Sequence, residues 1–173
     1  MVEIQGKFIT LAGMLLADKP EVLATINEFI EEETGCTHLE LDPNDYYDIE
    51  IWIKLLQHYR NSFDDHDQSL VDLGKRFYPT MKRTGDIDII NSKNPLDYLR
   101  DEINKSDEMI KGANGALQKK IIEENDNEVI MLAPSINTGS FLHIGVWLGL
   151  FEMLDIKTGG VEDLGNHKFR IYW

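Results

Sequence analysis

The sequence predicts an α+β fold in which a helical N-terminal part is followed by an α/β part with a small antiparallel sheet crossed by a helix. Three observations support this prediction. Apolar residues lie three and four positions apart in most segments before residue 110, which is the period of an amphipathic helix. After that point, two segments have the pattern of strand pairs around turn residues, and an apolar run of helix length lies between them. We expect a single domain with subdomains at about residues 1–84 and 85–173.

The first two helices are predicted in the N-terminal 35 residues. A buried first helix is expected from four apolar residues at helical spacing, namely Ile4, Phe8, Leu11 and Leu15. The apolar run around them is too short to span a bilayer. The second helix is predicted to begin near Asp18 and Pro20, since aspartate caps helix starts and proline fits the first turn, and to end at Gly35.

Three more helices follow in the pattern. Apolar spacing predicts one over residues 49–59 and another over residues 70–77, which Pro79 is expected to end because a proline cannot continue a helix. Pro95 opens the third, which has a charged outer face. Its inward residues are predicted to be Leu96, Leu99, Ile103 and Ile110.

Two hairpins and a helix are predicted at the C-terminus. One hairpin turns at the segment ENDN, residues 124–127, and the other turns at Gly165 and Asn166. In the last strand, alternation places Phe169, Ile171 and Trp173 on one face. A helix from about Thr138 to Leu154 is expected between the hairpins, where Gly145 and Gly149 allow close approach to the sheet or to another helix.

Composition excludes several classes of partner. The net charge of −14 repels phosphate backbones and anionic lipid surfaces, so neither nucleic acid nor a membrane is expected as a partner. The single cysteine, Cys36, rules out an internal disulfide and fits a reducing compartment, which predicts a cytoplasmic protein.

No catalytic residue or metal-ligand set is predicted. The acidic stretch Asp64–Asp67 could ligate a divalent metal only in a shaped loop, so a solvated helix connection is favoured. Ser135 or Ser140 with His143 does not have the spacing of a known triad. Carboxylates are too numerous for a pair of them to indicate general acid–base chemistry without spatial evidence. An enzyme is therefore the less favoured class.

The segment SINTGS, residues 135–140, has two interpretations. Its small polar residues precede an apolar helix, so they can cap that helix or form an anion-binding site at its start. The cap is favoured, and anion binding remains the alternative.

Five segments, in this order, carry a family resemblance: YYDIEIWIKLL, LVDLGKRFYPT, NPLDYLRDEINKSDEMI, EVIMLAPSINTGSFLHIGVWLGLFEML and FRIYW. On these segments the chain resembles the heme–nitric oxide/oxygen binding (H-NOX) family, and more closely its heme-less bacterial relatives. The resemblance implies a helical subdomain closing over an α/β one, with heme between them in the heme-binding members. It also implies a role in signalling.

The chain departs from this family at the heme contacts. The family's axial histidine lies on the helix before the sheet, but no histidine occurs between His66 and His143, and Ser106, Asp107 and Glu108 would be poor ligands. The family motif Tyr-x-Ser-x-Arg, which holds the heme propionates, falls on Ala133, Ser135 and Asn137, so only its serine is kept. Heme is therefore not expected as a cofactor.

The resemblance and its departures predict a heme-independent sensory or regulatory module that acts through a signalling partner or a small apolar ligand in the cleft between the subdomains. Large side chains are expected to refill most of that cleft. Its candidate residues are Trp52, Phe77, Leu99, Ile103, Met109, Ile110, Ser135, Asn137, His143 and Trp147. Two alternatives remain, namely a heme-based gas sensor that uses His58, His66 or His143, and a small hydrolase that uses carboxylates.

Overall fold

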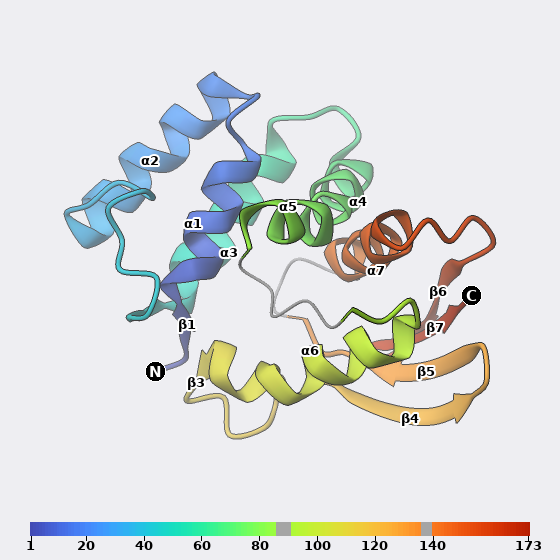
Figure 1. Ribbon diagram of the computed structural model, residues 1–173. Coiled ribbons are helices and arrows are strands. Elements are labelled where there is room, and N and C mark those ends of the chain that lie inside the picture. The colour runs from blue at the N-terminus through green and yellow to red at the C-terminus, as the bar shows by residue number, and fades with distance from the viewer. Residues whose placement is uncertain (86–90, 136–139) are drawn as a thin grey trace.

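The computed structural model describes residues 1–85, 91–135 and 140–173, and it has the predicted α+β architecture (Figure 1). The elements of the N-terminal part are β1 (Glu3–Gln5), α1 (Gly6–Leu15), α2 (Pro20–Thr34), β2 (Tyr46–Asp48), α3 (Ile49–Asn61), α4 (His66–Lys75) and α5 (Phe77–Thr84). Those of the C-terminal part are α6 (Pro95–Met109), β3 (Ile110–Lys111), β4 (Lys120–Asn125), β5 (Glu128–Leu132), α7 (Phe141–Met153), β6 (Gly160–Gly165) and β7 (Lys168–Tyr172). Among these helices none is long and apolar enough to cross a membrane.

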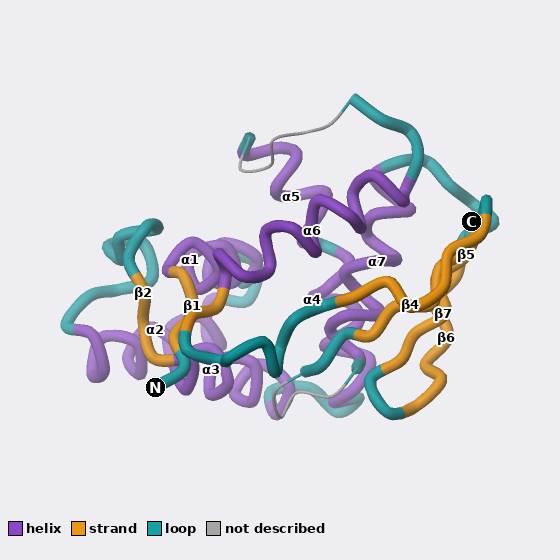
Figure 2. The backbone as a smooth tube through the Cα atoms, turned by 90° about the horizontal axis from the view of Figure 1, so that it is seen from below, coloured by secondary structure: helices purple, strands orange, loops and turns teal. Residues whose placement is uncertain are grey.

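A small sheet at the N-terminus was not predicted. Its strand order is β2-β1-β3, and Ile4 lies opposite both Tyr47 and Ile110 in antiparallel pairs. Ile4 therefore belongs to a strand, and the prediction that it starts the first helix is wrong, since α1 begins at Gly6. Figure 2 shows this sheet and the larger one at opposite ends of the molecule, with α6 between them. Because β3 follows α6 in the chain, this pairing joins residues on both sides of position 84, and the two-subdomain division stays a prediction.

Two helix boundaries show what proline does at a helix start. Pro20 is the first residue of α2, which ends as predicted at Gly35 with a positive φ of 74°, although Lys19 and not Asp18 precedes the helix. Pro79 was expected to end a helix, but it does not. It lies in the first turn of α5, after α4 has ended at Lys75, and it is tolerated there because its missing N–H would have no intrahelical acceptor.

The larger sheet has the order β4-β5-β7-β6 and contains both predicted hairpins. The second hairpin turns at Asn166 and His167, whose φ values of 52° and 60° suit a tight turn with two left-handed residues. Phe169 and Ile171 are buried on one face of the sheet, as the alternation in the last strand predicted.

Helix α7 joins two apolar cores. Leu142, near its start, belongs to the core formed by α1–α4, whereas Trp147 and Leu150 belong to the core between α7, α6 and the sheet. A Cβ atom placed on Gly145 would lie 2.1 Å from the carbonyl oxygen of Val71, and one on Gly149 would lie 2.3 Å from that of Lys75. The two glycines thus permit close approach to another helix, α4, which confirms one of the two predicted neighbours.

Candidate ligand-binding site

A cavity of about 730 Å³ is lined by residues of α1, α3, α5, α6 and α7. Its volume is within the range of ordinary small-molecule sites. Fifteen of its 28 lining residues in the described part of the chain are apolar, namely Ile4, Phe8, Leu11, Met14, Pro43, Ile49, Trp52, Phe77, Met81, Met109, Ile110, Leu117, Pro134, Leu142 and Val146. The expectation that large side chains refill the cleft is therefore wrong.

Six of the ten residues predicted from the sequence line this cavity: Trp52, Phe77, Met109, Ile110, Ser135 and His143. Their part in binding stays a prediction. Asn137 lies outside the described residues.

The structure corrects the placement of three other candidates. Leu99, Ile103 and Trp147 pack in the core between α6, α7 and the sheet and are not among the residues that line the cavity. Successive residues of a helix are about 100° apart, so an apolar stripe that faces the sheet leaves its neighbours on another face. On α6, the neighbours that line the cavity include Glu102, Lys105, Ser106 and Met109.

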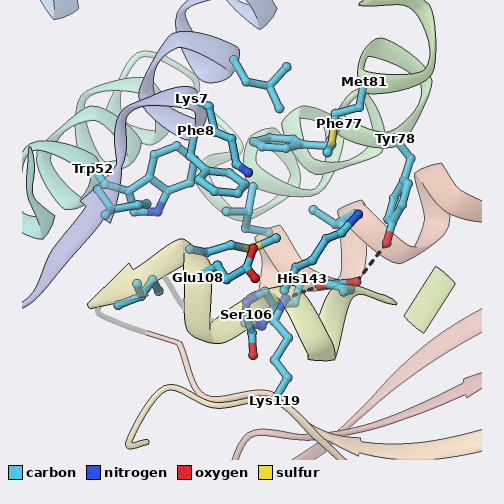
Figure 3. A pocket seen from close by; sticks show the side chains of 18 of the residues that line it. Lys7, Phe8, Trp52, Phe77, Tyr78, Met81, Ser106, Glu108, Lys119 and His143 are labelled. Atoms are coloured by element: carbon cyan, nitrogen blue, oxygen red, sulfur yellow. Dashed lines mark hydrogen bonds and ion pairs between the residues drawn. The ribbon is translucent and has the colours of Figure 1, made fainter. Parts of the chain in front are cut away.

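Glu102, a buried carboxylate that was not predicted, lines the cavity with its partners Tyr78 and Lys119, which Figure 3 labels, and these three residues form the buried polar end of the cavity. One oxygen of Glu102 accepts hydrogen bonds from the Tyr78 hydroxyl at 3.1 Å and from Trp147 Nε1 at 3.3 Å. Its other oxygen pairs with the Lys119 ammonium group. Only 9% of Glu102 is exposed, so these three donors replace its lost hydration.

The hydroxyl of Tyr78 is held in its donor form. Burial raises the pKa of Tyr78 well above its usual range, and the neighbouring Glu102 carboxylate raises it further. The phenol is therefore protonated at neutral pH, and it donates its hydrogen to the Glu102 carboxylate.

His143 lies at the same end of the cavity. Its imidazole contacts the ring of Trp147 at 5.6 Å and that of Phe169 at 6.1 Å between centroids. Nδ1 is buried and has no hydrogen-bond partner in the described part of the chain. Burial is the main reason that the pKa of His143 lies well below its usual value, with smaller contributions from the charges of Lys119 and His167. The side chain is therefore neutral at pH 7.

This neutral histidine predicts a loss of stability in acid. Below about pH 6.5 the unfolded chain binds a proton at His143 that the folded chain does not accept, whereas above that pH both states are neutral there. The free energy of unfolding should fall as the pH drops from 6.5, by up to about 1.4 kcal/mol per pH unit from this group.

Urea unfolding of the wild type and of His143→Gln at pH 8, 7, 6 and 5 measures this dependence. The glutamine variant should lose less stability in acid, and the difference isolates His143 from His38, whose pKa burial also lowers. Identical slopes for the two proteins would contradict the prediction.

Other candidates from the sequence have structural roles. Asp65 caps α4 by accepting a hydrogen bond from the backbone N–H of Gln68, and Asp67 pairs with Arg60 at 2.7 Å. No group of three potential metal ligands occurs in residues 1–85, 91–135 and 140–173. His58 and His66 are exposed and do not line the cavity, so only His143 remains of the three histidines considered for iron.

Of the segment SINTGS, the structure describes Ser135 and Ser140. Ser135 lines the cavity. Ser140 precedes α7 but makes no side-chain capping bond, and its hydroxyl bonds the Asp163 carboxylate. Residues 136–139, which include Asn137 and Thr138, lie outside the described part of the chain.

No protein-family model and no curated protein matches the chain. Two solved structures do, both of an H-NOX protein from K. algicida in the unliganded Fe(II) form, one of them a point mutant. The mutant has a TM-score of 0.66 and the unmutated protein 0.64, each at 16% sequence identity. Each comparison covers 98% of this chain and 96% of the other. The chain therefore has an H-NOX-like fold, as its resemblance to that family predicted.

Proposed function

We propose that the protein is a heme-independent sensory module that binds a small apolar ligand in the cavity and passes the bound state on to a signalling partner. The open cavity of about 730 Å³, lined mainly by apolar side chains, carries this proposal. An apolar molecule that enters it would remove both its own surface and that of the lining from water.

The cavity suits a sensor because it contacts two helices that reach other parts of the molecule. Leu142, His143 and Val146 bring α7 to the lining, and the same helix packs tightly on α4 through Gly145. Phe77 and Tyr78 bring α5 to the lining in the same way. A ligand that displaces these side chains would therefore shift helices outside the cavity, where a partner protein could detect the change.

The residues present do not fit heme as that family binds it. On α6, the helix that bears the family's axial histidine, the cavity-lining residues are Tyr98, Asp101, Glu102, Lys105, Ser106, Glu108 and Met109, and the Tyr98 hydroxyl donates to the carbonyl oxygen of Ser92. None is an imidazole, and Glu102 is already bonded to three donors. At the two propionate-binding positions that can be examined, Ala133 is buried and Ser135 lines the cavity.

Two observations bear on the alternatives. His143 is the histidine that lines the cavity, and its Nδ1 has no partner within the described ranges, so a heme sensor with this ligand is the second candidate. The hydrolase is less favoured, because Asp101 pairs with Lys105 at 2.9 Å and Glu102 is fully bonded.

Two titrations of the purified protein test the proposal, one with hemin and one with the neutral fluorescent dye Nile red. We expect a colorless protein with no stoichiometric Soret band, and one Nile red bound per chain. Met109→Trp should weaken the binding of Nile red at least tenfold, since it adds bulk in the cavity. The matched control Ile122→Trp adds the same ring on β4, at a residue that is 47% exposed, and should leave binding unchanged.

Two results would contradict the proposal. A stoichiometric Soret band that disappears in His143→Phe would establish the heme sensor instead. Nile red binding that Met109→Trp and Ile122→Trp leave equally intact would show that the dye binds outside the cavity.

A further inference from the structure

The charges that line the cavity are balanced. Three lysines, Lys7, Lys105 and Lys119, face three acids, Asp101, Glu102 and Glu108. Lys119 pairs with Glu102 and Lys105 with Asp101, whereas Lys7 and Glu108 are exposed. The cavity therefore has no excess charge to neutralise a charged ligand.

The buried polar end is balanced as well. Lys119 and Glu102 are 17% and 9% exposed in their side chains, so their opposite charges cancel in a region of low dielectric. His143 adds no charge, since it is neutral. A ligand carboxylate placed here would be an additional unpaired charge, which is strongly unfavourable in such surroundings.

Hydrogen-bonding groups at this end nevertheless remain available. The ammonium group of Lys119 has three hydrogens, and Glu102 is its one hydrogen-bond acceptor in the described structure. Nδ1 of His143, a residue that also lines the cavity, has no partner either among the described residues. A hydroxyl group can accept a hydrogen bond from Lys119 and donate one to His143, so it satisfies both.

Away from this polar end, the lining on α1 and α3 is apolar apart from Lys7 and Thr10. In Figure 3, Lys119 and His143 lie on the side of α6, and Phe8 and Trp52 lie across the cavity. A molecule with an apolar body and one polar head would match both parts of the lining at once.

We infer that the ligand is an uncharged apolar alcohol, whose hydroxyl group lies between Lys119 and His143 and whose apolar body extends toward Trp52. This inference rests on the proposed function and specifies its ligand. It excludes long-chain carboxylates, although their apolar chains are the same.

Competition with Nile red tests the head group, with dodecan-1-ol, dodecyl methyl ether and dodecanoate at pH 8 as probes. These share an apolar chain, but the ether can only accept a hydrogen bond and the carboxylate is charged. Dodecan-1-ol should compete about fivefold better than the ether and at least tenfold better than dodecanoate. Stronger competition by dodecanoate, or equal competition by all three probes, would overturn the inference while Nile red binding still supported the proposed function.

Variants locate the hydroxyl group. In His143→Phe, which keeps an aromatic ring, dodecan-1-ol should lose its advantage over the ether. The control His58→Phe changes an exposed histidine outside the cavity and should preserve that advantage.

If His143→Phe unfolds, the double variant Glu102→Gln/Lys119→Met keeps the polar end neutral and removes the Lys119 donor. An unchanged preference for the alcohol in a folded variant of either kind would show that its hydroxyl group lies elsewhere. Failure of Nile red to bind any folded protein would refute the proposed function and the inference together.

Discussion

Replacement of Glu102 by leucine should lower the free energy of unfolding by about 3–5 kcal/mol. The substitution leaves the Lys119 ammonium group with 17% of its side chain exposed and no opposite charge, and it removes the acceptor of Tyr78 and Trp147. A leucine side chain supplies apolar volume but no acceptor for these three donors. The penalty of unpaired buried groups therefore exceeds the gain from added apolar contact.

Urea unfolding of Glu102→Leu beside Glu124→Leu measures this effect. Glu124 also pairs with a basic side chain, Arg100, but these side chains are 38% and 53% exposed, so its replacement should lower stability by less than about 1 kcal/mol. The double variant Glu102→Leu/Lys119→Met should recover part of the loss, because it removes the uncompensated charge. Equal losses in the two single variants would show that the Glu102 network contributes no more than a surface ion pair.

Local patterns explain why so much of the fold could be predicted. The second hairpin depends on neighbouring residues, since its turn, at Asn166 and His167, lies one position after the predicted Gly165 and Asn166 and is followed by a strand of alternating apolar residues. The end of α2 likewise depends on one residue, Gly35, in a left-handed conformation. Such signals are complete within a few positions of the sequence.

The small N-terminal sheet has no comparable local signal. Its strands are two or three residues long, and β1 pairs with segments that begin at Tyr46 and Ile110. Strands this short are formed by long-range pairing and not by their own propensity. The spacing of Ile4 and Phe8 fits a helix just as well, which is why the helix was predicted to start too early.

The candidate site was predicted in part, for a related reason. Large apolar residues such as Trp52 and Phe77 were correctly expected near the cleft, but the apolar face of α6 was assigned to the cavity when Leu99 and Ile103 in fact face the sheet. Glu102 could not be recognised among 31 acidic residues, because only the tertiary structure brings Tyr78, Trp147 and Lys119 to it. His143 was identified because histidines are few in this chain.

The close crossing of α4 and α7 should make Gly145→Ala destabilising, although alanine has a higher helix propensity than glycine. Helix propensity alone favours alanine over glycine by about 1 kcal/mol. The added Cβ, however, would lie 2.1 Å from the carbonyl oxygen of Val71 and 2.9 Å from Cα of Gly74. Both are backbone atoms, so relief requires that a whole helix move. We expect overpacking to prevail and to lower the free energy of unfolding by about 1–3 kcal/mol.

Gly13→Ala is a suitable control for this prediction, since Gly13 is also a buried glycine within a helix. There the added Cβ would meet the buried ring of His38, which is bonded to Asn27, and so one side chain and not a whole helix must give way; the loss should therefore be smaller. Urea unfolding of the two variants, followed by circular dichroism, gives the comparison. Because α7 also carries Leu142, His143 and Val146 to the cavity, Gly145→Ala should weaken the binding of Nile red as well. A stable Gly145→Ala protein with unchanged dye binding would show that α7 can move away from α4 without disturbing the cavity, and would contradict the proposal that this helix pair passes on the bound state.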